Sequence, residues 1–195
     1  MKRIGSVVLT CAAVAAIGTG AALAVNSTPN PNQVASQLCT GELHAMGVTA
    51  FKNLYGDGPK KQHAMRNCKR AHGHAAGNLV NNASQRCKAE AADPNFPASH
   101  GGMTFDQFYG TNVNDKNSHG KCVSTKVHEA LAQNETNLQN AAQLCRAERA
   151  DASFPATHGG KTFREFYGTE KSKRKNAFGK CVSLKARAQS TPPST

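Results

Sequence analysis

The apolar positions between residues 121 and 154 recur at helical spacing, and this segment contains neither glycine nor proline. The stripe consists of Val123, Val127, Leu131, Leu138, Ala141 and Cys145, with Asn134 as its one polar gap. Such spacing is typical of an amphipathic helix. We therefore predict one long helix over residues 121–152. No segment alternates between apolar and polar residues clearly enough to predict a strand.

The rest of the chain also favours helices, so the predicted fold class is all-α. A connector at residues 62–93 resembles the long helix but carries Gly73 and Gly77, which lower helix propensity. The pattern TFxxFYG occurs at 104–110 and 162–168. Each copy predicts a short helix with its aromatic residues on one face, a threonine N-cap and a glycine C-cap.

An internal repeat sets the organisation of the chain. Residues 81–111 and 139–169 align without gaps and are identical at 20 of 31 positions. A fixed period of this kind indicates one supersecondary unit used several times. We define unit one as residues 36–76, unit two as 84–128 and unit three as 142–188. Unit one lacks the segment FPA-[ST]-HGG and resembles a shortened, capping copy.

The N-terminus reads as a secretory signal peptide over residues 1–24. Lys2 and Arg3 precede an apolar run, and Ala22-Leu23-Ala24 supplies an A-x-A cleavage site. An uncleaved anchor is the alternative, and Thr10 before Cys11 disfavours lipidation. Residues 25–35 read as a flexible linker and residues 189–195 as a disordered tail. With no second hydrophobic segment, we expect a secreted or cell-envelope-associated protein without a membrane span after cleavage.

Six cysteines remain after cleavage, and an even number in an exported chain indicates disulfides. Cys122 and Cys145 would lie about 35 Å apart on one helix, whereas a disulfide needs Cα atoms about 4.4–6.8 Å apart. The repeat then predicts three bridges, Cys39–Cys68, Cys87–Cys122 and Cys145–Cys181. A metal site is the competing interpretation, but the chain has no CxxC or CxxxC motif. The predicted architecture is three disulfide-closed helical hairpins joined by long shared helices.

Positive charge is concentrated in unit three. Cleavage would leave 22 basic and 12 acidic residues, a formal charge of +10, which favours anionic partners. Between residues 161 and 187 only Glu165 and Glu170 oppose nine basic residues. We predict polyanion contact through Lys161, Arg164, Lys171, Lys173, Arg174, Lys175, Lys180, Lys185 and Arg187. The alternative is that the charge only keeps the protein soluble.

The sequence contains no complete catalytic constellation, so we predict no catalytic residues, no cofactor and no enzyme. His100 and His158 occupy one repeat position, and we expect their rings to pack near Phe96 and Phe154 rather than to bind metal. The weaker metal candidates are His63, His72 and His74. His128-Glu129 begins an HExxH pattern that Ala132 breaks, and Pro155 breaks a P-loop-like stretch.

The pattern YGT…NAFGKCVS (Tyr167 to Ser183), following the CxAE segment from Cys145 to Glu148, resembles a group of exported repeat proteins from actinobacteria. The resemblance covers roughly residues 84–188 and implies export, but it implies no activity. Unit one departs from it, because it has Arg66-Asn67-Cys68 in place of the GKCVS ending.

Together these features predict an exported, non-enzymatic repeat protein that contacts polyanions such as cell-envelope polymer, nucleic acid or anionic lipid. One alternative is a structural or protein–protein interaction spacer of the cell envelope. A second alternative is a weak, histidine-dependent metal binder. The sequence predicts no particular protein partner.

Overall fold

The structure, a computed structural model, describes residues 28–111 and 114–190, and most of these residues are helical. The helices are α1 (Pro31–Met46), α2 (Val48–Tyr55), α3 (Ala64–Ala92), α4 (Phe96–Ser99), α5 (Phe105–Tyr109), α6 (Ser118–Ala150), α7 (Phe154–Thr157), α8 (Phe163–Tyr167), η1 (Glu170–Ser172) and α9 (Ala177–Ser190). In the described residues the only β pairing is an isolated bridge between Asp57 and Gln62. The all-α prediction is confirmed.

The long and short helices form where the sequence predicted them. Helix α6 covers the predicted 121–152 segment, and α3 runs unbroken through Gly73 and Gly77. Helices α5 and α8 begin at capping boxes, in which the threonine hydroxyl accepts from the backbone three residues on. Gly110 does end α5, but its φ of −67° is not left-handed. It is needed because a Cβ there would collide with the backbone of Asp106 and the side chain of Asp115.

The linker prediction was wrong over residues 31–35, because α1 begins at Pro31. Asn30 caps this helix by accepting a hydrogen bond from the Asn32 amide at 2.8 Å. Proline is favoured in the first turn of a helix, where its missing N–H costs no hydrogen bond. Helix α9 similarly continues to Ser190, two residues into the predicted tail. The predicted signal peptide lies outside the described residues.

All three predicted disulfides are present. They join Cys39 to Cys68, Cys87 to Cys122 and Cys145 to Cys181, with sequence separations of 29, 35 and 36 residues. Each bridge ties the helix that opens a unit to the helix that closes it. In the chain-entropy model, a loop of this length makes a bridge worth roughly 3–4 kcal/mol.

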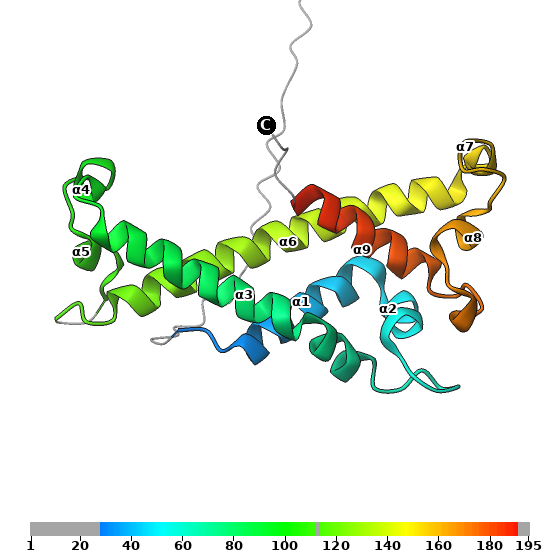
Figure 1. Cartoon of the computed structure of the whole chain (residues 1–195), viewed down its shortest axis with the longest axis horizontal. Coiled ribbons are helices and arrows are strands. Elements are labelled where there is room, and N and C mark those ends of the chain that lie inside the picture. Colours follow the sequence, from blue (N-terminus) through cyan, green and yellow to red (C-terminus); the bar gives the residue numbers. More distant parts are fainter. Residues whose placement is uncertain (1–27, 112–113, 191–195) are drawn as a thin grey trace, which may run out of the picture.

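The three units do not form a linear array. Helices α4 and α5 of unit two lie at one end of the molecule, and α7 and α8 of unit three lie at the other (Figure 1). Units one and three share a hydrophobic core that contains both Phe51 and Phe163, whereas unit two has its own core around Phe96 and Phe105. Unit one therefore packs together with unit three. Helix α1 joins the two cores, since Val34 packs in one and Met46 in the other.

A close approach between α2 and α9 connects unit one to unit three. Gly179 lies in α9 opposite Leu54 of α2, and a Cβ at Gly179 would lie 3.1 Å from two carbon atoms of Leu54. That separation is tighter than ordinary van der Waals contact. Helix α9 can therefore pack at this distance only because position 179 carries no side chain.

We expect Gly179→Val to destabilise the protein by about 1–3 kcal/mol, because its side chain would enter the space that Leu54 occupies. Urea unfolding followed by circular dichroism measures the change in the free energy of unfolding. The matched control is Gly77→Val in α3, where an added Cβ meets no atom within 4 Å. Equal destabilisation of the two variants would mean that helix propensity, and not the packing of α2 on α9, accounts for the effect.

Candidate functional site

Each unit contains the same polar cluster beside its disulfide. A glutamate follows the opening cysteine by three residues, a tyrosine ends the short helix, and a cationic residue follows the closing cysteine by four. In unit three, Tyr167 donates to Glu148 Oε2 at 2.9 Å and Lys185 Nζ lies 2.6 Å from Glu148 Oε1. In unit two, the hydroxyl of Tyr109 lies 3.2 Å from Glu90 Oε2, and Lys126 Nζ lies 2.6 Å from Glu90 Oε1.

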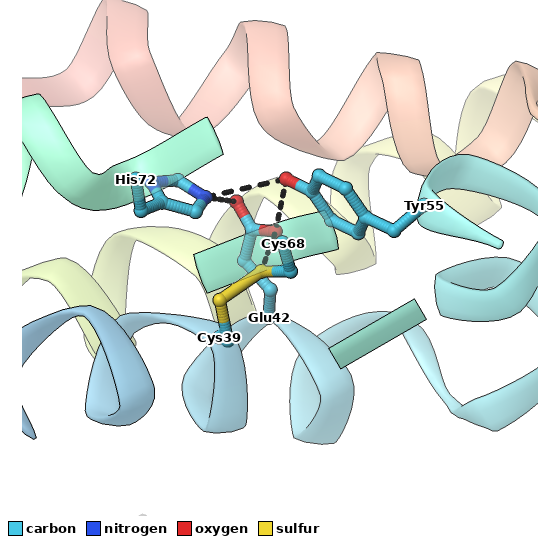
Figure 2. Close-up of polar contacts among 5 residues, drawn as sticks. All are labelled: Cys39, Glu42, Tyr55, Cys68 and His72. Atoms are coloured by element: carbon cyan, nitrogen blue, oxygen red, sulfur yellow. Dashed lines mark hydrogen bonds and ion pairs between the residues drawn. A yellow bond between two sulfur atoms is a disulfide. The ribbon is translucent and has the colours of Figure 1, made fainter. Parts of the chain in front are cut away.

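Unit one has histidine in place of lysine. Tyr55 donates to Glu42 Oε2 at 2.6 Å, and His72 Nε2 lies 3.2 Å both from Glu42 Oε1 and from the Tyr55 hydroxyl (Figure 2). This cluster is more enclosed than the other two, since the Glu42 side chain is only 7 % exposed. The Sγ atom of Cys68 lies 3.9 Å from Glu42 Oε2.

The arrangement satisfies the glutamate carboxylate, whose side chain is 7 % exposed in unit one and 30 and 28 % exposed in units two and three. One glutamate oxygen accepts from the tyrosine and the other faces the cation, so the opening helix, the short helix and the closing helix meet at one residue. A buried carboxylate without such partners would be strongly destabilising. The repetition of the cluster in three units indicates a structural role. Sequence reasoning missed this cluster, although the spacings CxxE and Cxxx[KH] recur in every unit.

Unit one also contains the one group of three metal-ligand side chains found in the described residues. The ligand atoms of Cys39, Cys68 and His72 all lie within 4.8 Å of one another. The two sulfur atoms are bonded to each other, however, and so offer no thiolate to a metal. The other two predicted candidates, His63 and His74, do not join this group. His63 precedes α3, and His74 lies two helical positions from His72, on a different face.

The clusters raise the pKa values of the tyrosines. Burial and the neighbouring Glu90 carboxylate raise the pKa of Tyr109 to about 12. Burial and Glu148 raise the pKa of Tyr167 to about 12 as well. In unit one, burial and the charge of Glu42 raise the pKa of Tyr55 well above the usual range for a phenol.

A second feature, formed mainly by unit three, is a basic pocket of about 220 Å³. Phe163 and Phe178 contribute apolar walls, and Asn53 of α2 reaches it from unit one. Four cationic side chains line the same cavity: Arg149, Arg164, Arg174 and Lys175. We call this set, with Asn53, the unit-three pocket.

The cations of the unit-three pocket are only lightly engaged. Arg174 lies 3.4 Å from Glu165 in an exposed ion pair, which is a weak interaction. Arg164 contacts the Lys173 carbonyl at 3.5 Å, and the Arg149 guanidinium lies over the Phe178 ring, 5.6 Å from its centroid. Arg174 also has a positive φ of 61°, a conformation that is uncommon for a residue other than glycine. The positively charged loop before α9 therefore lies beside α8.

Unit two carries different charges at the matching positions. Counting from the shared cysteine, phenylalanine and glycine positions, Arg149 corresponds to Ala91, Arg164 to Asp106 and Arg174 to Asp115. Asp115 has a positive φ of 51°, close to that of Arg174. Asp115 and Arg174 therefore share a left-handed backbone conformation and differ in the sign of their charge.

The structure gathers only part of the predicted polyanion set. Arg164, Arg174 and Lys175 line the unit-three pocket, whereas Lys161, Lys171, Lys173 and Lys180 are exposed outside it. Lys185 is held by Glu148, and Arg187 acts electrostatically on Tyr55. Sequence reasoning missed Arg149 and Asn53. Arg149 could have been found by comparing the units, because unit two has alanine there.

The two histidines of the repeat pack as expected. The ring of His100 stacks on Phe96 with centroids 3.7 Å apart, and that of His158 stacks on Phe154 at the same distance. In both units the histidine Nδ1 lies 2.9 Å from the carbonyl oxygen of that phenylalanine. Each histidine thereby closes the short turn before two glycines of positive φ.

Comparisons with known protein families, with curated proteins and with solved structures find no match. The resemblance to exported actinobacterial repeat proteins therefore stays a prediction. Within residues 28–111 and 114–190, no helix is both long enough and apolar enough to cross a membrane.

The raised tyrosine pKa values can be measured directly, because the chain has three tyrosines and no tryptophan. Phenolate absorbance should show Tyr109 and Tyr167 ionising near pH 12. Unfolded tyrosine ionises near pH 10, so the stability that these groups provide below pH 10 should disappear between about pH 10 and 12.

Glu90→Gln should move the pKa of Tyr109 back toward its ordinary value, and the same change at Glu129, which contributes less, should move it only slightly. Circular dichroism at each pH establishes that the protein is still folded. An unchanged titration in the Glu90 variant would contradict the role assigned to the cluster.

Proposed function

We propose that this chain is an exported, non-enzymatic helical repeat protein that binds polyanions through unit three. The observation that carries the proposal is the convergence of Arg149, Arg164, Arg174 and Lys175 on one cavity. A signal-like N-terminus and three disulfides support an oxidising compartment outside the cytoplasm. Cell-envelope polymers, nucleic acids and anionic lipids are the candidate polyanions there.

The dimensions of the unit-three pocket favour one charged group of a longer chain. Its volume of about 220 Å³ is below the roughly 300–1,000 Å³ of typical small-molecule sites. Arginine forks match the oxygen geometry of phosphate and sulfate groups. We therefore expect a phosphate or sulfate group in the pocket, with neighbouring groups of the polymer reaching exposed lysines such as Lys171 and Lys173.

Unit two supports a functional interpretation of this charge. The Phe, Tyr, Gly and Cys positions are common to both units, so the fold accounts for them, but the fold does not require arginine at 164 or 174. Asp106 and Asp115 stand at these positions in unit two. Charge that only kept the protein soluble would have no need to converge on a cavity.

Binding should be measured with duplex DNA, heparin, anionic vesicles and teichoic acid over a salt series. We expect steep salt dependence. The variant Arg164→Asp/Arg174→Asp, which copies unit two, should weaken binding by about tenfold or more. It should also lower the log–log salt slope by about one for each arginine that no longer meets a phosphate. Aspartate suits the left-handed backbone at 174, since Asp115 adopts it in unit two.

The matched control is Lys88→Asp/Lys116→Asp, which changes the net charge equally at exposed positions of unit two. Equal weakening of binding in the two double variants would mean that overall charge attracts the polyanion without the pocket. If the wild-type protein binds nothing at low salt, the proposal fails and the spacer interpretation takes its place.

A further inference from the structure

Unit one has a pocket of its own, and its chemistry differs from that of the unit-three pocket. The cavity has a volume of about 380 Å³, within the range of small-molecule sites. Its apolar surface comes from Leu43, Val48, Phe51 and Met65. Its cationic rim comes from Lys52, Lys60, Lys61 and Arg66. We call this cavity the unit-one pocket.

The apolar surface is open because unit one lacks the FPA-[ST]-HGG segment. In units two and three, the residue nine positions after the opening cysteine is a phenylalanine, Phe96 or Phe154. Each is at most 3 % exposed and packs on the first phenylalanine of the short helix, with centroids 5.6 or 5.7 Å apart. In unit one the residue nine positions after the opening cysteine is Val48, which is 58 % exposed. No aromatic ring from that segment covers Phe51, which its other neighbours still bury to 3 % exposure, so Val48 is the apolar residue left exposed.

The cationic rim is free to meet a ligand. In the described part of the chain, no carboxylate forms an ion pair with Lys52, Lys60, Lys61 or Arg66. Asp57, the acidic residue of this turn, lies 3.3 Å from the side-chain amide of Asn67. The rim thus places several unpaired positive charges around an apolar surface.

Two of these cations replace carboxylates of unit two. Lys52 follows Phe51 as Asp106 follows Phe105. Lys61 lies against the glycine that ends the short helix, as Asp115 does in unit two, and both residues have positive φ, 52° and 51°. The positive charge is therefore not a requirement of the shared turn, since unit two carries aspartate at both positions.

We propose that the unit-one pocket binds a single-chain anionic amphiphile of the fatty-acid class. Its alkyl chain lies on Val48, Leu43 and Met65, and the nearly buried Phe51 forms the base of the cavity. Its acidic head lies among Lys52, Lys61 and the rest of the rim. A purely polar anion would leave the apolar surface in water, and a neutral or cationic amphiphile would leave the rim without a counter-charge.

The proposal does not depend on polyanion binding. Helix α2 separates the two sites, since Lys52 lines the unit-one pocket and the next residue, Asn53, lines the unit-three pocket. The charge reversals at Arg164 and Arg174 should therefore leave amphiphile binding unchanged. Failure of one proposal would be seen without failure of the other.

The test is calorimetric titration of the full mature protein with dodecanoate below its micelle threshold. We expect one equivalent to bind. Lys52→Asp/Lys61→Asp, which copies the carboxylates of unit two, should weaken the affinity about tenfold or more. Val48→Phe, which enlarges an exposed residue of the pocket lining, should weaken it similarly by filling the cavity. Circular dichroism confirms that both variants remain folded.

Three matched comparisons can overturn the proposal. The variant Lys88→Asp/Lys116→Asp has the same change in net charge and should bind dodecanoate like the wild type. Dodecyltrimethylammonium and acetate, which share only the chain or only the head group, should not compete. Equal binding of dodecyltrimethylammonium, equal weakening in the unit-two control, or no binding of dodecanoate to the wild type would each refute the site.

Discussion

Two interactions connect the helices of each unit, and they lie one helical turn apart. The first is a disulfide, and the second is a glutamate carboxylate that contacts a tyrosine hydroxyl and a cationic side chain. In unit three, Cys145 and Glu148 lie on the opening helix, and Cys181 and Lys185 lie on the closing helix. The disulfide lowers the conformational entropy of the unfolded chain, but it makes no connection to the short helix. Tyr167 attaches that helix, because its hydroxyl reaches the glutamate that the lysine already holds. The small hydrophobic core therefore need not fix three helices by apolar contact alone.

The prediction from sequence succeeded where one local signal decided the outcome. The apolar stripe from residue 121 onward, free of glycine and proline, predicted α6. The length of that helix excluded a Cys122–Cys145 bridge, and the repeat then indicated the disulfide pairing. The prediction failed where distant segments meet. Nothing local to α2 or α9 indicates that Leu54 will pack on Gly179, so the shared core of units one and three could not be derived from the repeat.

The candidate sites show the same division. The density of charge in the loop before Cys181 pointed to the correct region, but density counted Lys185, which Glu148 neutralises. The density of charge did not indicate Arg149, because this residue lies in α6, far from the loop in sequence, and the fold brings it to the pocket. The glutamate of the polar cluster is part of the CxAE segment, which recurs in units two and three. Its role required a tyrosine 19 residues further on to lie within hydrogen-bond distance, and spacing alone does not establish that contact.

Comparison of the three units distinguishes the residues that the shared fold requires from the residues whose charge differs between units. The cysteines, the glutamate, the tyrosine and the closing glycine hold the helices together, so changes there disrupt packing or leave a buried charge without a partner. The residue after the first phenylalanine of the short helix has no contact that all three units share. It is lysine in unit one, aspartate in unit two and arginine in unit three. Residues 61, 115 and 174 show the same variation on a shared left-handed backbone. One frame can therefore carry a positive pocket in unit one and another in unit three, with aspartates at the matching positions of unit two, because the charges lie at positions on which folding does not depend.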